Sequence, residues 1–221
     1  MDTVLNNSKS KKLEKLERVL SHASELFANS EYHQVSMEDI ASRAAVGKGT
    51  LYNLFNSKDD LYFSIIRNRL RQLLDVLKET YDMRFDTMNN LRSLILHLHK
   101  FMSKYQHFYR IWKREEGAIN GSRSHKEIRE LQDQMIELVV RILRKGESED
   151  VVRRGMDHKL TARLVLGMVD GLNKTKEKVY EREHCIDDLL RTLVYGIGTE
   201  KADTQVRYDH FRHSRGGGSR D

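Results

Sequence analysis

Proline is absent from all 221 residues of the chain, and this absence restricts the fold more than any other single feature. Proline makes up about 5% of an average protein, so chance would leave it out of such a chain with a probability on the order of 10⁻⁵. Proline breaks helices and occupies turns, and a chain of helices joined by short connections tolerates its absence best. The sequence therefore favours an all-α fold.

Apolar residues recur at steps of three and four along most of the chain, which is the spacing of one helical face. The first such face consists of Leu13, Leu16, Leu20, Ala23 and Phe27, in a helix expected from residue 10 to Asn29. Further helices are predicted over residues 37–46, 48–55, 58–80, 88–106, 108–116, 127–145, 158–183 and 186–196. No segment shows the sustained alternation of a half-buried strand, so about nine helices are expected.

Two short helices with a tight turn between them are predicted in the N-terminal quarter. Ser36 is a favourable N-cap and Asp39 stands at the third helical position, as in a capping box. Gly47 interrupts the apolar pattern about two turns later, and the next short helix begins at Lys48. The small residues that allow close crossing are Ala41, Ala44 and Ala45. This is the geometry of a helix-turn-helix, whose second helix enters the major groove of DNA.

The outward side of the second short helix carries side chains that form hydrogen bonds with DNA. They are Lys48, Thr50, Tyr52 and Asn53. Lysine donates to guanine, asparagine binds adenine through two hydrogen bonds, and the threonine methyl touches thymine. Net charge does not carry this prediction. The chain has a formal charge of +6, but residues 1–60 hold eight Lys or Arg against nine Asp or Glu. The placement of the polar side chains carries it.

The segment from Ser36 to Leu61 resembles the DNA-binding signature of TetR-family regulators. The matching positions are Ile40, Ala41, Ala44, Val46, Gly49, Tyr52, Phe55, Lys58 and Leu61. The resemblance is strong over residues 12–65, and the rest of the chain agrees in length and helix count. Two positions depart from the family pattern. The turn reads Ala44-Ala45-Val46-Gly47 instead of Ala-Gly-Val-Ser, and Leu54 replaces a common aromatic residue.

The resemblance implies a role for each DNA-contacting position. Ser36 and its neighbouring amides would hold a phosphate at a helix N-terminus, and Tyr52 and Lys58 would bind two others. Gly49 would let the backbone approach DNA, and Arg43 is a weaker candidate for a backbone contact. The base-reading residues would be Lys48, Thr50 and Asn53. The alternative is that Tyr52 is a packing residue and Lys58 a solvated charge.

Sequence pattern and the resemblance together divide the chain into regions. Residues 1–9 are expected to be disordered, 10–56 to form a three-helix DNA-binding domain, 57–198 to form a larger helical regulatory and dimerisation domain, and 199–221 to form a flexible tail. The candidate dimer-interface residues are Leu164, Gly167, Met168, Gly171, Leu189 and Leu193. The aromatic cluster that could line a ligand pocket is Phe101, Tyr105, Phe108, Tyr109 and Trp112. Both sets could instead be ordinary core within one chain.

Several functional classes are not supported by the sequence. The single cysteine, Cys185, cannot form an intrachain disulfide, and the histidines match no usual zinc spacing, so neither metal nor cofactor is expected. The chain has no apolar run of membrane-spanning length and no secretion signal, which predicts a cytoplasmic protein. No nucleophile elbow or phosphate loop occurs, so an enzyme is not expected.

The predicted function is that of a DNA-binding transcriptional regulator. The preferred form is a homodimeric repressor, released from a palindromic operator by an unknown small-molecule effector. One alternative is a ligand-independent or architectural DNA-binding protein on the same fold. Another is a helical dimer that has lost DNA binding.

Overall fold

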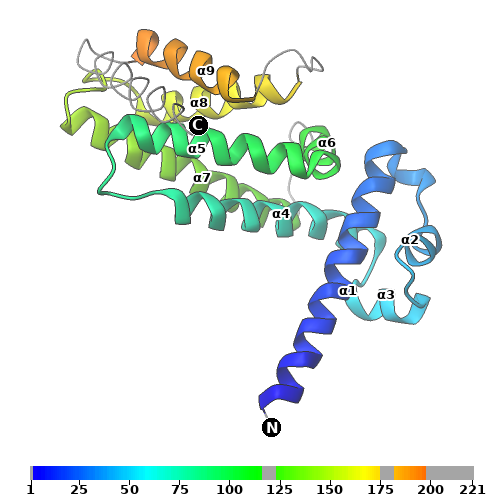
Figure 1. Ribbon diagram of the computed structural model, residues 1–221. Helices are drawn as coiled ribbons and strands as arrows, with labels where there is room; N and C mark the ends of the chain where they lie inside the picture. Colours follow the sequence, from blue (N-terminus) through cyan, green and yellow to red (C-terminus); the bar gives the residue numbers. More distant parts are fainter. Residues whose placement is uncertain (1, 116–122, 175–181, 198–221) are drawn as a thin grey trace, which may run out of the picture. The chain divides into compact units, whose positions relative to one another are not determined.

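The computed structural model describes residues 2–115, 123–174 and 182–197, and these residues form helices without a β-strand (Figure 1). The elements are α1 (Asp2–Asn29), the short 3-10 helix η1 (Tyr32–Gln34), α2 (Met37–Arg43), α3 (Lys48–Leu54), α4 (Lys58–Thr80), α5 (Thr87–Lys104), α6 (Gln106–Glu115), α7 (Arg123–Ser148), α8 (His158–Lys174) and α9 (Arg182–Ile197). The predicted all-α class is confirmed, and nine α-helices lie within the described residues. The tail predicted over 199–221 lies outside them.

The chain divides into two compact units that are not the predicted sequence regions. One unit is Met1–Gln72 with Lys104–Leu131, and the other is Leu73–Ser103 with Gln132–Asp221. The boundary expected after residue 56 therefore falls inside the first unit. The reason is that α6 joins α1, where the Arg114 guanidinium donates to the Phe27 carbonyl oxygen at 3.2 Å.

The core of the first unit forms where α1, α2, α3 and α4 meet. Its fully buried side chains include Leu20, Phe27, Ile40, Leu51, Leu61 and Ile65. The Phe27 and Tyr62 rings pack edge to face with their centroids 4.9 Å apart. Each large apolar side chain buried here contributes about 1.5–3 kcal/mol, which fixes the short helices α2 and α3 against the longer α1.

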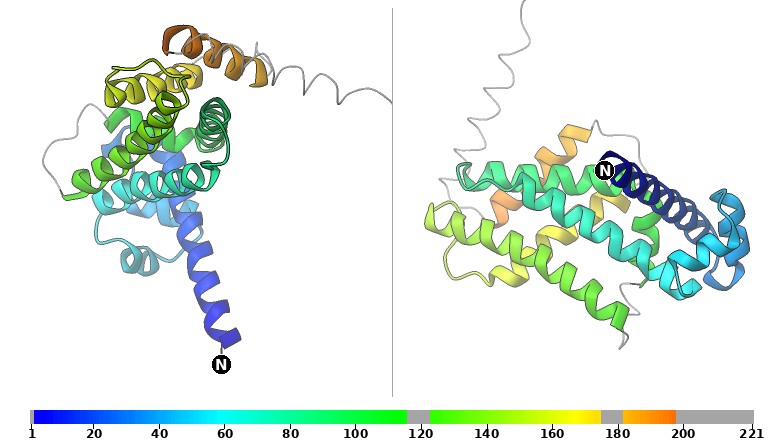
Figure 2. Two further views of the ribbon diagram at one scale, coloured as in Figure 1. Left: turned by 90° about the vertical axis from the view of Figure 1, so that its left-hand side faces the viewer. Right: turned by 90° about the horizontal axis from the view of Figure 1, so that it is seen from below.

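Helix α1 is longer than the core that it packs against. It begins at Asp2, so residues 2–9 are helical although the sequence analysis placed them outside the first helix. Leu13, expected on the inner face, is 65% exposed. The N-terminal turns of α1 extend past α3 within the same unit (Figures 1 and 2). Apolar spacing predicts which face a helix would bury, but it does not reveal where the neighbouring helices end.

The second unit contains α5, α8, α9 and the adjoining parts of α4 and α7. The Thr87 amide and hydroxyl both donate to Glu149 Oε2, at 3.0 and 2.7 Å, which ties the start of α5 to the end of α7. An ion pair between Arg92 and Asp187 links α5 to α9. Among the described helices, none combines the length and apolarity needed to cross a membrane.

Candidate DNA-binding interface

A capping box sets the start of α2. The Ser36 Oγ accepts a hydrogen bond from the Asp39 amide at 3.0 Å, and Asp39 Oδ2 accepts one from the Ser36 amide at 3.0 Å. The Ser36 hydroxyl also donates to Asp39 Oδ2 at 2.6 Å. The predicted cap is confirmed. Because the cap uses the hydroxyl hydrogen, the phosphate role assigned to Ser36 would rest on neighbouring backbone amides, and it stays a prediction.

The turn between α2 and α3 places an alanine in the left-handed region. The Val46 amide donates to the Ala41 carbonyl at 3.0 Å, and the Ala45 amide donates to the Ser42 carbonyl at 3.1 Å. This pair of bonds is a Schellman motif, whose C′ residue has positive φ and is usually glycine. Here it is Ala45, with φ 51°. Gly47, the departure noted in the sequence, has φ −64° and serves as the N-cap of α3 without a side-chain hydrogen bond.

The two sides of α3 differ as predicted. Leu51 within the helix and Phe55 at its C-cap are buried in the core, at 0% and 4% exposure. Tyr52 is 45% exposed, so it is not a packing residue of the chain in this structure. The remaining outward positions are Lys48, Gly49 and Asn53, which are exposed, and Thr50, which is half-buried. This side of α3 therefore carries the polar groups that are predicted to contact DNA.

Two of the predicted DNA-contacting cations are paired with carboxylates. Lys48 forms an ion pair with Glu38 of α2, and Arg43 lies 3.0 Å from Glu25 of α1. The hydrogen bond from Lys48 lowers the pKa of the Glu38 carboxyl, and the same bond raises the pKa of the Lys48 ammonium. All four side chains lie at the surface, where such pairs contribute little stability and can be exchanged for other partners. DNA phosphates would compete with Glu38 and Glu25 for these cations.

Lys58 makes contacts that the sequence did not reveal. Its Nζ donates to the carbonyl oxygens of Tyr32 and Val35, both at 3.0 Å, and lies 4.3 Å from the centroid of the Tyr32 ring. These contacts hold the η1 segment against the start of α4. An ammonium group has three N–H donors, and two are used here. The role of Lys58 in phosphate binding therefore stays a prediction, beside a positioning role that the contacts define.

A groove beside α3 contains residues that the sequence analysis did not assign to DNA. It has a volume of about 370 Å³ and lies between α1 and α3. Its lining residues are Lys11, Lys12, Lys15, Thr50, Asn53 and Leu54. The sequence analysis assigned no role to the three lysines. The run of lysines was visible in the sequence, but its position next to α3 depends on the packing of α1.

Comparisons with known proteins match both parts of the chain. Residues 19–65 match the model "Bacterial regulatory proteins, tetR family", and residues 86–174 match "Tetracyclin repressor-like, C-terminal domain". The chain belongs to the TetR family. It is therefore a DNA-binding transcriptional regulator, and the region from Ser36 to Lys58 is its helix-turn-helix.

Relatives of known identity agree with this assignment. The fatty acid metabolism regulator protein of Bacillus subtilis is 23% identical, over 81% of this chain and 94% of its own length. The structure of the ketosteroid regulator KstR2 of Mycobacterium tuberculosis has a TM-score of 0.71 at 19% identity, covering 84% of this chain and 95% of that one. The regulator FadR from Bacillus subtilis, in complex with stearoyl-CoA, has a TM-score of 0.69 at 22% identity, covering 82% and 98%. These two structures share the fold of this TetR-family chain.

The aromatic residues predicted to line a pocket are divided between the two units. Phe101 belongs to α5 in the second unit, whereas the other four lie in the first. Phe108 is 1% exposed and stacks on Trp112, with ring centroids 5.8 Å apart. The Arg69 guanidinium lies 4.3 Å from the centroid of the Tyr105 ring, and Tyr109 is buried. Tyr105 and Trp112 are half-buried, and a role of the cluster in ligand binding stays a prediction.

The residues predicted to form the dimer interface differ in how exposed they are. Leu189 and Leu193 of α9 are buried within the chain, so they pack in its own core. Leu164 of α8 is 59% exposed. Gly167 and Gly171 are also exposed on α8, and an added Cβ at either position would meet no described atom within 4 Å. Among the described residues α8 therefore has an exposed face, and its role in a dimer stays a prediction.

Helix α6 is bonded to both α1 and α4 of the first unit. The Tyr62 hydroxyl donates to Glu115 Oε1 at 2.8 Å, and the Arg110 guanidinium donates to Asn29 Oδ1 at 3.1 Å. Burial and the bond to Glu115 raise the pKa of Tyr62, which keeps its hydroxyl protonated as a donor. No group of three metal-ligating side chains occurs in the part of the chain that the structure describes.

Proposed function

We propose that this TetR-family regulator is a cytoplasmic repressor that binds a palindromic operator as a homodimer and is released by a small effector. It acts by binding and not by catalysis. The observation that carries the DNA-binding part is the orientation of α3, which buries Leu51 and exposes Tyr52 and Asn53. In a helix-turn-helix this arrangement lets the second helix read base edges while the first supports it.

A homodimer is supported by the geometry that palindromic DNA requires. Two recognition helices reach successive major grooves when they are about 34 Å apart, and twofold symmetry supplies that pairing. The exposed apolar side chains near the C-terminus include Leu160, Leu164 and Tyr195. Leu160 and Leu164 lie one turn apart on α8, so a second copy packing on this helix would bury both side chains.

The dimer proposal is tested by changing an exposed leucine of α8. Leu164→Lys is expected to convert the dimer to a monomer in sedimentation velocity and to weaken operator binding. Leu13→Lys is the matched control, because Leu13 is similarly exposed on α1, and it should leave the dimer intact. A Leu164→Lys variant that sediments like the unchanged chain would rule out α8 as the interface.

The proposed effector is an acyl-coenzyme A. The B. subtilis structure with stearoyl-CoA supports this class. A local feature agrees with ligand binding near α6: the Trp112 Nε1 is buried and has no hydrogen-bond partner among the described residues. An unpaired buried donor costs about 1–3 kcal/mol, and a ligand carbonyl oxygen would satisfy it. A shift of α6 would then reach α1 and α4 through Arg114 and Glu115.

The experiment begins by selecting bound sequences from random duplex DNA. A palindrome is expected, and Asn53→Ala should weaken its binding by about tenfold or more, since a good bidentate base contact contributes about 1–3 kcal/mol. Tyr52→Phe removes only the hydroxyl and should weaken binding less. Failure of the unchanged chain to enrich any duplex, with no effect of either variant, would refute the proposed function.

The effector is tested by titrating stearoyl-CoA into the complex with the selected duplex. Release is expected with stearoyl-CoA but not with coenzyme A or stearate alone. Trp112→Phe should reduce the response while leaving DNA affinity unchanged, because it removes the N–H donor and keeps an aromatic ring beside Phe108. If acyl-CoAs of several chain lengths leave the complex intact, the acyl-CoA proposal is wrong and the ligand-independent alternative gains support.

A further inference from the structure

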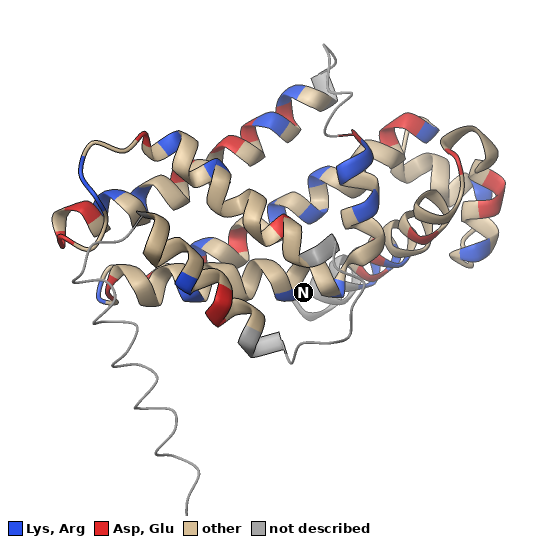
Figure 3. Cartoon of the chain, turned by 90° about the horizontal axis from the view of Figure 1, so that it is seen from above, with Lys and Arg blue, Asp and Glu red and all other residues tan. Residues whose placement is uncertain are grey.

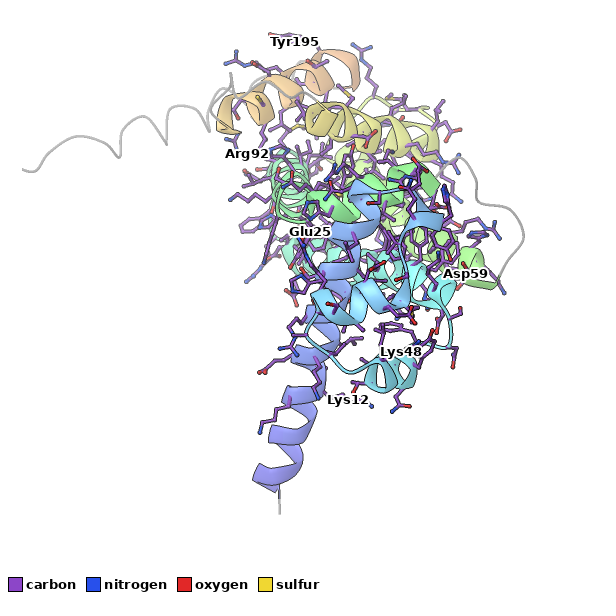
Figure 4. All side chains as sticks on the ribbon, turned by 90° about the vertical axis from the view of Figure 1, so that its right-hand side faces the viewer. Lys12, Glu25, Lys48, Asp59, Arg92 and Tyr195 are labelled. Carbon is purple, nitrogen blue, oxygen red and sulfur yellow. The ribbon has the colours of Figure 1, made fainter. Side chains whose placement is uncertain are left out.

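The groove between α1 and α3 joins base-reading residues to a group of lysines. Thr50 and Asn53 form one wall, on the side of α3 that faces DNA in a helix-turn-helix. Lys11, Lys12 and Lys15 of α1 form the other wall. In Figure 4, Lys12 extends from α1 on the side where α3 lies. Any DNA that brings base edges to α3 would bring its backbone to these lysines.

The three lysines differ from the other cations of the interface in their partners. Arg43 and Lys48 are already paired with carboxylates. No ion pair joins the three lysines to a carboxylate in the described ranges, and all three are exposed. Glu17, on the same helix, forms an ion pair with Arg69 at 2.9 Å, so its carboxylate pairs with a cation other than these lysines. Three positively charged side chains therefore gather on this side of α1 within the described residues.

The lysines of α1 differ from the rest of the chain, where positive and negative charges are mixed. Basic and acidic residues are mixed along the described helices in Figure 3, and residues 1–60 hold nine acidic residues against eight basic ones, so net charge does not account for attraction to DNA. The backbone of duplex DNA carries one negative charge per about 1.7 Å of helix axis. Three ammonium groups beside the recognition helix would meet this charge directly, whereas the same lysines elsewhere would remain solvated.

We propose that the α1–α3 groove seats the sugar–phosphate backbone of one operator strand, with Lys11, Lys12 and Lys15 neutralising its phosphates. The proposal rests on the proposed operator binding and extends it to the N-terminal turns of α1. These contacts are independent of sequence: they position α3 and supply affinity, while Lys48, Thr50 and Asn53 select the bases. The length of α1 beyond the core then has a function, because those turns carry the lysines to the DNA.

The test replaces all three lysines with glutamine and measures affinity for the selected duplex and for a random duplex over a range of KCl concentrations. Lysine and glutamine have similar helix propensities, so α1 should persist, as circular dichroism would verify. Each lost phosphate contact lowers the slope of log affinity against log salt by about 0.9. Three contacts in each protomer make six in the proposed dimer, so the affinity change between 50 and 200 mM should be on the order of 10³-fold smaller than in the unchanged chain.

The control variant is Lys78→Gln, Lys100→Gln and Lys159→Gln, which removes the same charge from exposed positions of the second unit. It should leave the slope unchanged. The α1 variant should lose affinity equally for both duplexes, and ethylation of the phosphates that it contacts should no longer interfere with its binding. This ethylation pattern identifies the backbone as the ligand.

Two results separate failure of this proposal from failure of operator binding. If the α1 variant keeps the salt slope and affinity while Asn53→Ala loses the selected duplex, the groove does not hold phosphates although the operator function stands. If the unchanged chain binds no duplex, both proposals are wrong. The proposal would also be overturned if the control variant reduced the salt slope as much as the α1 variant does. The net charge of the protein, and not the position of the lysines, would then explain the effect.

Discussion

Replacing Ala45 with glycine is expected to stabilise the helix-turn-helix. Ala45 has φ 51°, where an L-residue other than glycine costs about 1–2 kcal/mol. Glycine avoids this cost but loses more backbone entropy on folding, about 0.5–1 kcal/mol. The difference is a net stabilisation of about 0.5–1 kcal/mol. The two hydrogen bonds of the turn join backbone atoms only, and the exposed Ala45 methyl buries little surface, so neither offsets the gain.

The effect can be measured globally and locally. For a chain of this size 1 kcal/mol shifts Tm by about 2–4 °C, so Ala45→Gly should raise Tm by about 1–4 °C in circular dichroism. Exchange of the amide hydrogens of α2 and α3 should slow by about two- to fivefold, which places the gain in the helix-turn-helix. Affinity for the selected duplex should change by less than about twofold, because the backbone of the turn is kept.

The matched control is Ala44→Gly at the preceding residue. Ala44 has φ −81° and is buried, so glycine there relieves no strain and removes a packed methyl group. It should destabilise the chain by about 1 kcal/mol or more. If Ala45→Gly also lowers Tm and speeds exchange in α2 and α3, the left-handed residue is not a source of strain and the reasoning fails.

Three further predictions concern packing, pH and the interface. Gly146→Ala should lower Tm by several degrees, since the new Cβ would lie 2.7 Å from Thr87 Cγ2, whereas alanine at an open glycine of α8 should not. Burial alone would raise the pKa of Glu149, but the hydrogen bonds from Thr87 dominate and lower it. The stabilisation from the ionised Glu149 is fully present at pH values above its ordinary pKa near 4.5, and it is lost as the pH falls through the lowered pKa. The Glu149→Gln variant should therefore lose less stability than the unchanged chain when the pH is lowered. Glu38→Gln frees Lys48 and should tighten binding to duplex DNA by about two- to fivefold in fluorescence anisotropy; weaker binding would show that the carboxylate assists recognition.

The sequence by itself determined the helices and the local structure of the DNA-binding motif. Apolar spacing repeats within each helix, and the cap at Ser36 forms through Asp39, three positions away, so neither depends on distant parts of the chain. The inward position of Leu51 and the outward position of Tyr52 follow from the same spacing, because neighbouring residues on a helix point in different directions.

Only the tertiary structure decided which residues far apart in the sequence meet. Lys58 was predicted to bind a phosphate. In the structure it donates to the carbonyl oxygen of Tyr32, 26 positions earlier, and so holds η1 in place. Leu189 lies in the core of its own chain instead of on an exposed face. The lysines of α1 stand beside Thr50 because α1 continues past the core. These contacts depend on the lengths and crossing directions of packed helices, which local periodicity and capping do not encode.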